Sequence, residues 1–304
     1  MNAPRALAPA ITHDTGFVEV ADRCWMARYE FLDVNVGVVA GDRGLLVIDT
    51  SASEVDARRV LEQARRLGAG EVVAVLNTHQ HFDHCFGNVV FSEAYDGVPI
   101  HAHENAVSGL RVSGPAFQEQ AARDAQGGPG RERSAHIAET RILVPDHPFS
   151  SARAIDLGDR FVEVLHPGRG HTAGDAVARV PDVDLMFAGD LVEESRIRNG
   201  APGFGDDCFP LEWAATLDLM ISMLTASSTV VPGHGMPVDK DFVTEQRGSI
   251  GMVAETIRSL AGQGVPVEEA LATGEWPYPV EELRHAVERG YVQLPPGGRS
   301  LPML

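Results

Sequence analysis

The chain has little cysteine and no long apolar run. Its three cysteines, spread over 304 residues, are odd in number and widely spaced, which argues against a disulfide scaffold and is consistent with a reducing cytoplasm. No stretch approaches the roughly 20 apolar residues that a membrane-spanning helix needs. Residues 1–16 lack the apolar core of a secretory signal. We therefore predict a cytoplasmic protein with no membrane partner.

Positive charge is also scarce. The sequence has 25 lysine and arginine residues against 43 aspartate and glutamate residues, a formal net charge of −18. Proteins that bind nucleic acid need basic surfaces to hold phosphates, so we expect a small-molecule substrate and no nucleic-acid partner. A hydrophobic content of 44% is ordinary for a folded globular chain. Nothing in the sequence indicates the oligomeric state.

Short apolar runs and amphipathic segments alternate along the chain. Runs rich in β-branched residues and bounded by turn residues predict strands at 18–20, 24–29, 34–39, 45–49, 72–76, 98–102, 153–156, 161–165, 176–180 and 184–188. Helical spacing of apolar residues predicts helices at 53–67, 82–91, 211–226 and 242–261. Ser53 can cap the first of these, and Pro210 stands at the start of the third.

Two regions are less regular. Residues 105–126 have a helical pattern, but Gly109, Gly114 and Pro115 predict that it is broken. Residues 127–134 are expected to form a flexible, charged stretch. The insertion at 113–135 is either part of a substrate wall or a solvated loop. Residues 265–304 are expected to add one or two short helices and a tail rich in proline and glycine.

Metal-ligand residue types cluster directly after the strand at 72–76. His79, His81, Asp83 and His84 form an H-x-H-x-D-H pattern within six residues. Placing three imidazoles and a carboxylate on one buried loop is costly unless a divalent metal compensates. Zinc favours histidine nitrogen and aspartate oxygen, and zinc sites with an open position are the catalytic ones. The pattern therefore predicts a metal site. Cys85 is not expected to be a ligand, because a helix would point it away from His84.

Three later segments repeat one arrangement, in which a strand is followed by a tight glycine turn and a potential ligand. These segments carry His171, Asp190 and His234. Glycine is expected there because the backbone must turn sharply or approach a metal closely.

The order and spacing of these residues resemble the five motifs of the metallo-β-lactamase superfamily, over roughly residues 23–243. The resemblance implies an α/β fold: an αβ/βα four-layer sandwich of two mixed β-sheets with helices outside. It also implies a tail and first strand at 1–22, a catalytic domain at 23–264 and a helical extension and tail at 265–304. By this similarity two metals are bound. The first would be held by His79, His81 and His171, the second by Asp83, His84 and His234, with Asp190 bridging.

The resemblance also implies a chemistry. Two zinc ions per chain would share a bridging hydroxide that opens an ester, thioester, lactone or amide carbonyl of a small molecule, with Asp83 as the catalytic residue. Such a histidine-rich set suits zinc and is similar to the glyoxalase II, lactonase and histidine-rich β-lactamase branches. A mononuclear Fe²⁺ persulfide dioxygenase of the same fold stays open as an alternative. A non-catalytic binding protein is a third interpretation, which the complete ligand set disfavours.

Other histidines and two arginines need separate interpretations. His101 and His103 are expected to be structural or helix-capping, and His166 a turn residue or pocket wall. Arg196 and Arg198 follow Asp190, so they could bind a substrate carboxylate or pair with Glu193 or Glu194, and the pairing is slightly favoured. The remaining histidines are expected on the surface: His13, His136, His147 and His285.

Overall fold

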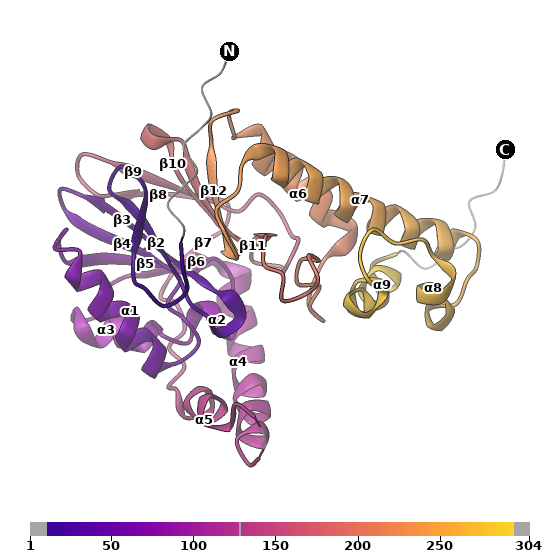
Figure 1. Cartoon of the computed structure of the whole chain (residues 1–304), viewed down its shortest axis with the longest axis horizontal. Helices are drawn as coiled ribbons and strands as arrows, with labels where there is room; N and C mark the ends of the chain where they lie inside the picture. The colour runs from indigo at the N-terminus through magenta and orange to yellow at the C-terminus, as the bar shows by residue number, and fades with distance from the viewer. Residues whose placement is uncertain (1–10, 128, 295–304) are drawn as a thin grey trace.

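Two β-sheets packed face to face form the centre of the molecule in the computed structural model, which describes residues 11–127 and 129–294 (Figure 1). The first sheet has the strand order β1-β2-β3-β4-β5-β6-β7 and the second β12-β11-β10-β9-β8. Helices cover the outer side of each sheet. The predicted four-layer α/β sandwich is confirmed.

The first sheet is mixed. Strands β1 to β4 are antiparallel and β4 to β7 are parallel. Its strands are β1 (Val18–Ala21), β2 (Cys24–Arg28), β3 (Asn35–Gly41), β4 (Gly44–Ile48), β5 (Val72–Leu76), β6 (Ile100–His103) and β7 (His147–Phe149). Because β4 and β5 are parallel, the segments that follow them leave the sheet at the same end.

The second sheet is also mixed, since β8 to β11 are antiparallel and β11 and β12 are parallel. Its strands are β8 (Ala152–Asp156), β9 (Phe161–Leu165), β10 (Val177–Val180), β11 (Leu185–Glu193) and β12 (Thr229–His234). The expected turn after residue 188 is wrong. Gly189, with φ 52°, produces an irregular register instead, and the strand continues to Glu193.

The covering helices follow the predicted amphipathic segments. Ser53 caps α1, because its hydroxyl accepts a hydrogen bond from the backbone N–H of Asp56. Pro210 begins α6 as predicted. The helices are α1 (Glu54–Arg66), α2 (Phe82–Cys85), α3 (Asn88–Ala94), α4 (Glu104–Asp124), α5 (Arg131–Glu139), α6 (Pro210–Ser222), α7 (Lys240–Gly262), α8 (Val267–Thr273) and α9 (Arg284–Gln293).

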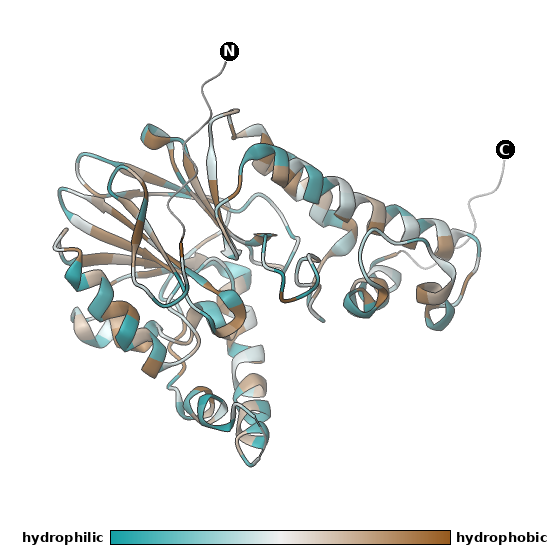
Figure 2. Ribbon diagram, in the orientation of Figure 1, coloured by the Kyte–Doolittle hydropathy of each residue, from teal (hydrophilic) through white to brown (hydrophobic). Residues whose placement is uncertain are grey.

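Three buried clusters join the layers. The strands of both sheets are coloured mostly as hydrophobic residues, whereas the surrounding helices carry both hydrophobic and hydrophilic residues (Figure 2). Helices α1 and α3 cover the first sheet through a cluster that includes Val36, Val47, Val60, Val75 and Phe91. The two sheets contact each other through Met26, Leu46, Leu76, Val164 and Phe187. Helices α6 and α7 cover the second sheet through Met186, Trp213, Leu217, Ile250 and Ile257.

Three predictions about helical segments differ from the structure. Helix α4 is continuous through Pro115, which lies, like Arg111 one turn earlier, on the exposed side of the helix. The stretch expected to be flexible at 127–134 instead contains the start of α5. Helix α5 packs on α4 through a cluster that includes Leu110, Ala121 and Ile137. The helix predicted at 82–91 is divided into α2 and α3.

The C-terminal helices α8 and α9 pack on α6 and α7 within one shared buried cluster. The domain boundaries at 22 and 264 stay predictions. The N-terminal residues 1–10 and the predicted tail at 295–304 lie outside the described residues. Within the described part of the chain, no helix is both long and apolar enough to cross a membrane.

Candidate metal centre

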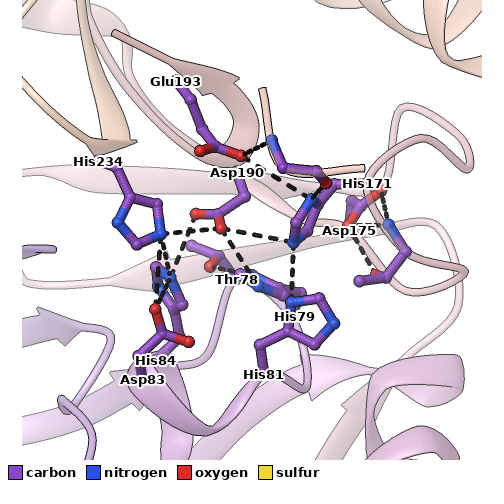
Figure 3. A network of polar contacts seen from close by, with 12 residues as sticks. Thr78, His79, His81, Asp83, His84, His171, Asp175, Asp190, Glu193 and His234 are labelled. Carbon is purple, nitrogen blue, oxygen red and sulfur yellow. Dashed lines mark hydrogen bonds and ion pairs between the residues drawn. The ribbon is translucent and has the colours of Figure 1, made fainter. Parts of the chain in front are cut away.

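The seven predicted ligands meet at one end of the two sheets (Figure 3). The first four, His79 to His84, come from the loop after β5 and from the short helix α2. His171 lies in the loop after β9. Asp190 lies within β11, and His234 is the last residue of β12. Segments far apart in sequence are thus brought together at one edge of the sandwich, where β5, β9 and β12 end and β11 passes.

The side chains form two groups whose ligand atoms lie within 4.8 Å of one another. One group is His79, His81, His171 and Asp190, and the other is Asp83, His84 and His234. The Asp190 carboxylate lies between them: its Oδ2 is 3.4 Å from His171 Nε2 and 3.0 Å from His234 Nε2, and its Oδ1 is 3.2 Å from His84 Nε2. This grouping matches the predicted division into two sites. The roles of these residues as ligands stay a prediction.

Backbone carbonyls determine which nitrogen of two rings faces the centre. His171 Nδ1 lies 2.8 Å from the Gly203 carbonyl oxygen, and His234 Nδ1 lies 2.7 Å from that of Leu32. A carbonyl can only accept, so both Nδ1 atoms carry the proton. The Nε2 atoms therefore point inward, each with a free lone pair when the ring is neutral.

Carboxylates determine which nitrogen faces the centre in two further rings. Asp49 Oδ2 lies 2.8 Å from His84 Nδ1, and both oxygens of Asp207 lie 3.2 Å from His81 Nε2. These acceptors place the protons on the outer nitrogens. Metal-binding histidines commonly have such an outer partner, because it fixes the tautomer and the ring orientation.

The inner nitrogens consequently face one another. His171 Nε2 lies 2.8 Å from His81 Nδ1, and His84 Nε2 lies 3.3 Å from His234 Nε2. Two neutral rings in this arrangement would direct lone pairs at each other. Each facing pair therefore needs a proton or a cation between its nitrogens.

Two buried polar atoms at the centre have no hydrogen-bond partner, although Asp190 Oδ1 lies within ion-pair distance of His84 Nε2. Among the described residues, His79 Nε2 and Asp190 Oδ1 accept or donate no hydrogen bond. The Thr78 hydroxyl donates to Asp49 and accepts from His79 Nδ1, so His79 Nε2 is an unused acceptor. Buried polar atoms are rarely left unsatisfied. Five imidazoles and two carboxylates with inward lone pairs fit divalent metal ions.

Protons satisfy the first group poorly at neutral pH. Burial lowers the pKa of His171 to about 3 and holds that of His79 well below its ordinary value. Burial also opposes a charged His81, but the Asp207 carboxylate raises the pKa of that ring. Two of the three rings therefore stay neutral and can bind a cation without first losing a proton.

The two rings of the second group lie among several carboxylates. Burial opposes charged forms of His84 and His234, but Asp190 and Asp83 raise both pKa values, that of His234 to about 9. The same rings, together with the other histidines, hold the pKa of Asp190 well below its usual value against the effect of burial. A divalent cation here would replace ring protons.

Strained backbone surrounds the centre. Leu32, Asp33 and Asp49 have φ values of 57°, 58° and 64°. The left-handed conformation costs a non-glycine residue about 1–2 kcal/mol, and such strain concentrates at functional sites. Leu32 supplies the carbonyl that contacts His234, and Asp49 supplies the carboxylate that contacts His84. Two residues with strained backbone thus supply the outer hydrogen-bond partners of two rings.

Sequence reasoning missed the outer partners. Asp49 could have been predicted as an outer partner. It follows β4, and the parallel neighbour β5 leads into the His79 segment, so both segments leave the sheet at the same end. Asp207 and Gly203 lie in an irregular loop, and no pattern identifies them. Glu193 forms a third cluster with Asp190 and His234. Its carboxylate accepts from the Gly203 N–H at 2.6 Å.

The part of the sequence that holds this centre matches a known family. The family model described as the metallo-beta-lactamase superfamily matches residues 29–234. The chain belongs to this superfamily. The match ends at His234, so α7 to α9 lie beyond it.

Individual relatives in the superfamily are distant. A metallo-beta-lactamase type 2 of Bacillus sp. (strain 170) is 23% identical over 206 residues, which cover 68% of each chain. A linear primary-alkylsulfatase of Pseudomonas sp. (strain ATCC 19151) is 24% identical over 66% of this chain and 41% of its own. The crystal structure of DIM-1 metallo-beta-lactamase has a TM-score of 0.58 at 17% identity, and covers 77% of this chain and 95% of its own. This last likeness shows the fold.

The arrangement of the centre requires glycine at position 233. A Cβ atom there would lie 1.8 Å from Asp190 Oδ1. We expect Gly233→Ala to displace Asp190 and to weaken metal binding at least tenfold, measured by competition with a chromophoric chelator. In Gly248→Ala, the new methyl group has open space in α7. That variant should keep its metal affinity and gain about 0.5–1 kcal/mol of stability. Equal affinities in the two variants would contradict the role of Gly233.

A pocket of about 370 Å³ opens beside the two groups. Phe82 and Phe117 form part of its wall, with ring centroids 4.7 Å apart. Phe117 belongs to α4, so the 113–135 insertion contributes to the wall, as one of its two interpretations anticipated. The C-terminal segment also contributes. The lining includes Leu32, His81, Asp83, His171, Asp190, Arg198, Phe204, Asp206, Asp207, Glu281, Glu282, Arg284 and His285.

The two predicted substrate arginines lie in different places. Arg198 lines the pocket, but its Nη1 donates to Glu193 Oε2 at 2.8 Å, which is the pairing favoured from the sequence. Arg196 lies outside the pocket, because the turn after β11 directs it to a separate hollow beside Arg28 and Asp33. Its predicted contact with substrate is therefore unsupported.

The remaining histidines largely follow their interpretations. His103 caps α4, since its Nδ1 accepts from the Asn105 N–H. His166 stacks on His103 with ring centroids 3.8 Å apart. His13 and His285 are exposed, as predicted. His13 also contacts the Asp33 carboxylate at 2.7 Å, and His285 lines the rim of the pocket. Cys85 is buried, and its thiol donates to backbone carbonyls.

Proposed function

We propose that the protein is a metal-dependent hydrolase that uses two zinc ions to open a carbonyl of a small molecule. The supporting observation is the convergence of five imidazoles and two carboxylates, with inward lone pairs, beside a pocket of about 370 Å³. A pocket of this size suits a small molecule. Histidine nitrogen and aspartate oxygen suit zinc.

The residues divide into ligands for two metal ions. His79, His81 and His171 would hold one ion and Asp83, His84 and His234 the other, with the central Asp190 between them. When bound, two such ions can lower the pKa of a water molecule towards neutrality and polarise a carbonyl oxygen. Asp83 lines the pocket, and its Oδ2 lies 3.5 Å from His234 Nε2. It is placed to orient a water molecule and to accept its proton.

The substrate class is an ester, thioester, lactone or amide. The relatives are named as a metallo-beta-lactamase and an alkylsulfatase, and a 47-residue segment is 49% identical to a hydroxyacylglutathione hydrolase of Gloeobacter violaceus. These names differ in substrate, so family membership does not select one. The pocket wall contains aromatic rings, which suit an apolar part of a substrate. Its two arginines, Arg198 and Arg284, are each paired with a glutamate, so they do not select an anionic substrate.

Elemental mass spectrometry of the protein purified without added metal tests this function. We expect about two zinc ions per chain, and hydrolysis of at least one member of a panel of thioesters, lactones and β-lactams. About one iron ion per chain with little zinc would overturn the proposal in favour of the persulfide dioxygenase alternative. Oxygen uptake with a thiol persulfide would then be the next measurement.

A further inference from the structure

The turn between β2 and β3 contains two consecutive residues in the left-handed conformation. Leu32 and Asp33 have φ values of 57° and 58°, and neither is glycine. Such a conformation persists only where surrounding contacts hold it. The turn also reaches the metal centre, because Leu32 lines the pocket. What holds this turn is therefore relevant to the centre.

An ion pair holds the turn from its outer side. Arg28, the last residue of β2, donates two hydrogen bonds to the Asp33 carboxylate, from Nε at 2.5 Å and from Nη2 at 2.8 Å. His13 Nε2 lies 2.7 Å from the same carboxylate. The side chains of Arg28 and Asp33 are only 16% and 9% exposed. Burial alone would raise the pKa of Asp33, but Arg28 and His13 lower it, so the carboxylate is charged at neutral pH.

The backbone of the turn contacts the opposite side, where His234 lies. The Leu32 carbonyl accepts from His234 Nδ1 at 2.7 Å, and the Asp33 carbonyl accepts from the Gly235 N–H at 3.1 Å. The first contact keeps the proton on Nδ1 and leaves Nε2 free to face the centre. Orientation of the His234 ring thus depends on the left-handed turn.

A second connection fixes the loop that carries His234. The Asn35 side chain donates to the Pro232 carbonyl at 2.9 Å and to the Gly235 carbonyl at 2.8 Å. This connection does not involve the ion pair. Loss of the ion pair should therefore leave the loop in place and change mainly the direction of the Leu32 carbonyl.

We propose that the Arg28–Asp33 ion pair is a positioning element for the second metal site. Without it, Leu32 and Asp33 can relax to a right-handed backbone, which turns the Leu32 carbonyl away from His234 Nδ1. The inference rests on the proposed function, since it requires a metal at Asp83, His84 and His234. In the described residues, no hydrogen bond joins the turn to His79, His81 or His171. The ion pair should therefore affect the first site only indirectly, through Asp190, which lies between the two groups.

Stepwise zinc affinity of the full chain tests this inference. Asp33→Asn keeps the size of the side chain and removes its charge. We expect the affinity for the second zinc ion to fall about 10–100-fold, the range typical of lost outer partners, with the first changed far less. Competition with a chromophoric chelator gives both constants, and the visible absorption of Co²⁺ reports the geometry of each site. Arg28→Lys keeps the charge but not the paired donors, so it should lose less.

A matched control uses another two-bond ion pair. Arg247 donates to Asp218 at 2.8 and 2.6 Å between α7 and α6, and Arg247→Gln should leave both zinc affinities unchanged. Unchanged second-site affinity in folded Asp33→Asn, or equal weakening of both sites, would overturn the inference. If Asp33→Asn does not fold, His13→Asn removes only one contact and is judged by the same criteria. Wild-type protein that binds fewer than two zinc ions would overturn the proposed function instead.

Discussion

Replacing Asp83 by alanine is expected to lower kcat/KM for hydrolysis by about 10²–10⁴-fold while the protein stays folded. This range is typical of the loss of a group that moves a proton in the transition state, and it corresponds to about 3–5 kcal/mol of activation free energy. Asp83 is placed for that role because it lines the pocket and also lies in the second metal group. Steady-state kinetics on the best substrate and circular dichroism of the variant make the measurement.

A neighbouring aspartate provides the control. Asp206 lines the same pocket but belongs to neither metal group, so Asp206→Ala should change kcat/KM far less than Asp83→Ala. Zinc content measured in parallel separates loss of a metal from loss of proton transfer. A decrease of less than tenfold in folded Asp83→Ala would contradict a catalytic role for this residue. It would favour a binding function for the site.

The metal cluster could be predicted because its residue types carry the information themselves. Histidine and aspartate in the pattern of His79 to His84 have few other uses, and His171, Asp190 and His234 each follow an apolar run. Strand ends could be read from those runs, so the convergence of these residues follows once the strands form one sandwich. The structure brings all seven together in the expected two groups.

The outer contacts could not be predicted in the same way. Two of the five outer partners are backbone carbonyls, those of Leu32 and Gly203, and a carbonyl has no residue type by which to recognise it. The left-handed turn at Leu32 and Asp33 is equally hidden, because neither residue is the glycine that usually marks positive φ. Arg28, which pairs with Asp33, lies close to it in sequence, but no sequence rule links that spacing to a left-handed turn.

For helix α4, the local rule that proline interrupts a helix led to a wrong prediction. Pro115 lacks an N–H, which usually interrupts a helix at a cost of about 3 kcal/mol. Here the helix continues because Pro115 faces water and Gly114 packs beside Ile142. Contacts with α5 and with the segment after it stabilise α4 as a whole. Such contacts between segments cannot be read from the local sequence.

Removal of the metal ions is expected to lower the thermal stability strongly. Each ion bound at 100–1,000 times its dissociation constant contributes about 3–4 kcal/mol to the free energy of unfolding, so two ions contribute about 6–8 kcal/mol. At about 2–4 °C per kcal/mol for a chain of this size, a chelator should lower Tm by about 10–30 °C. Without cations, His79 Nε2 and Asp190 Oδ1 stay buried without a hydrogen bond, and the facing rings must take up protons. Differential scanning calorimetry with and without a chelator measures the change.

Adding back different metal ions tests whether the lost thermal stability comes from the metal centre. Zinc added back in slight excess should restore Tm, whereas Mg²⁺ should not, because Mg²⁺ prefers six oxygen ligands and the centre offers mostly imidazole nitrogen. Gly248→Ala should show the same chelator effect as wild type, since its methyl group lies in open space on α7. Gly233→Ala should show a smaller one, because the displaced Asp190 weakens the ions that the chelator removes. A chelator effect below about 2 °C in wild-type protein would mean that protons, and not metal ions, satisfy the buried histidines.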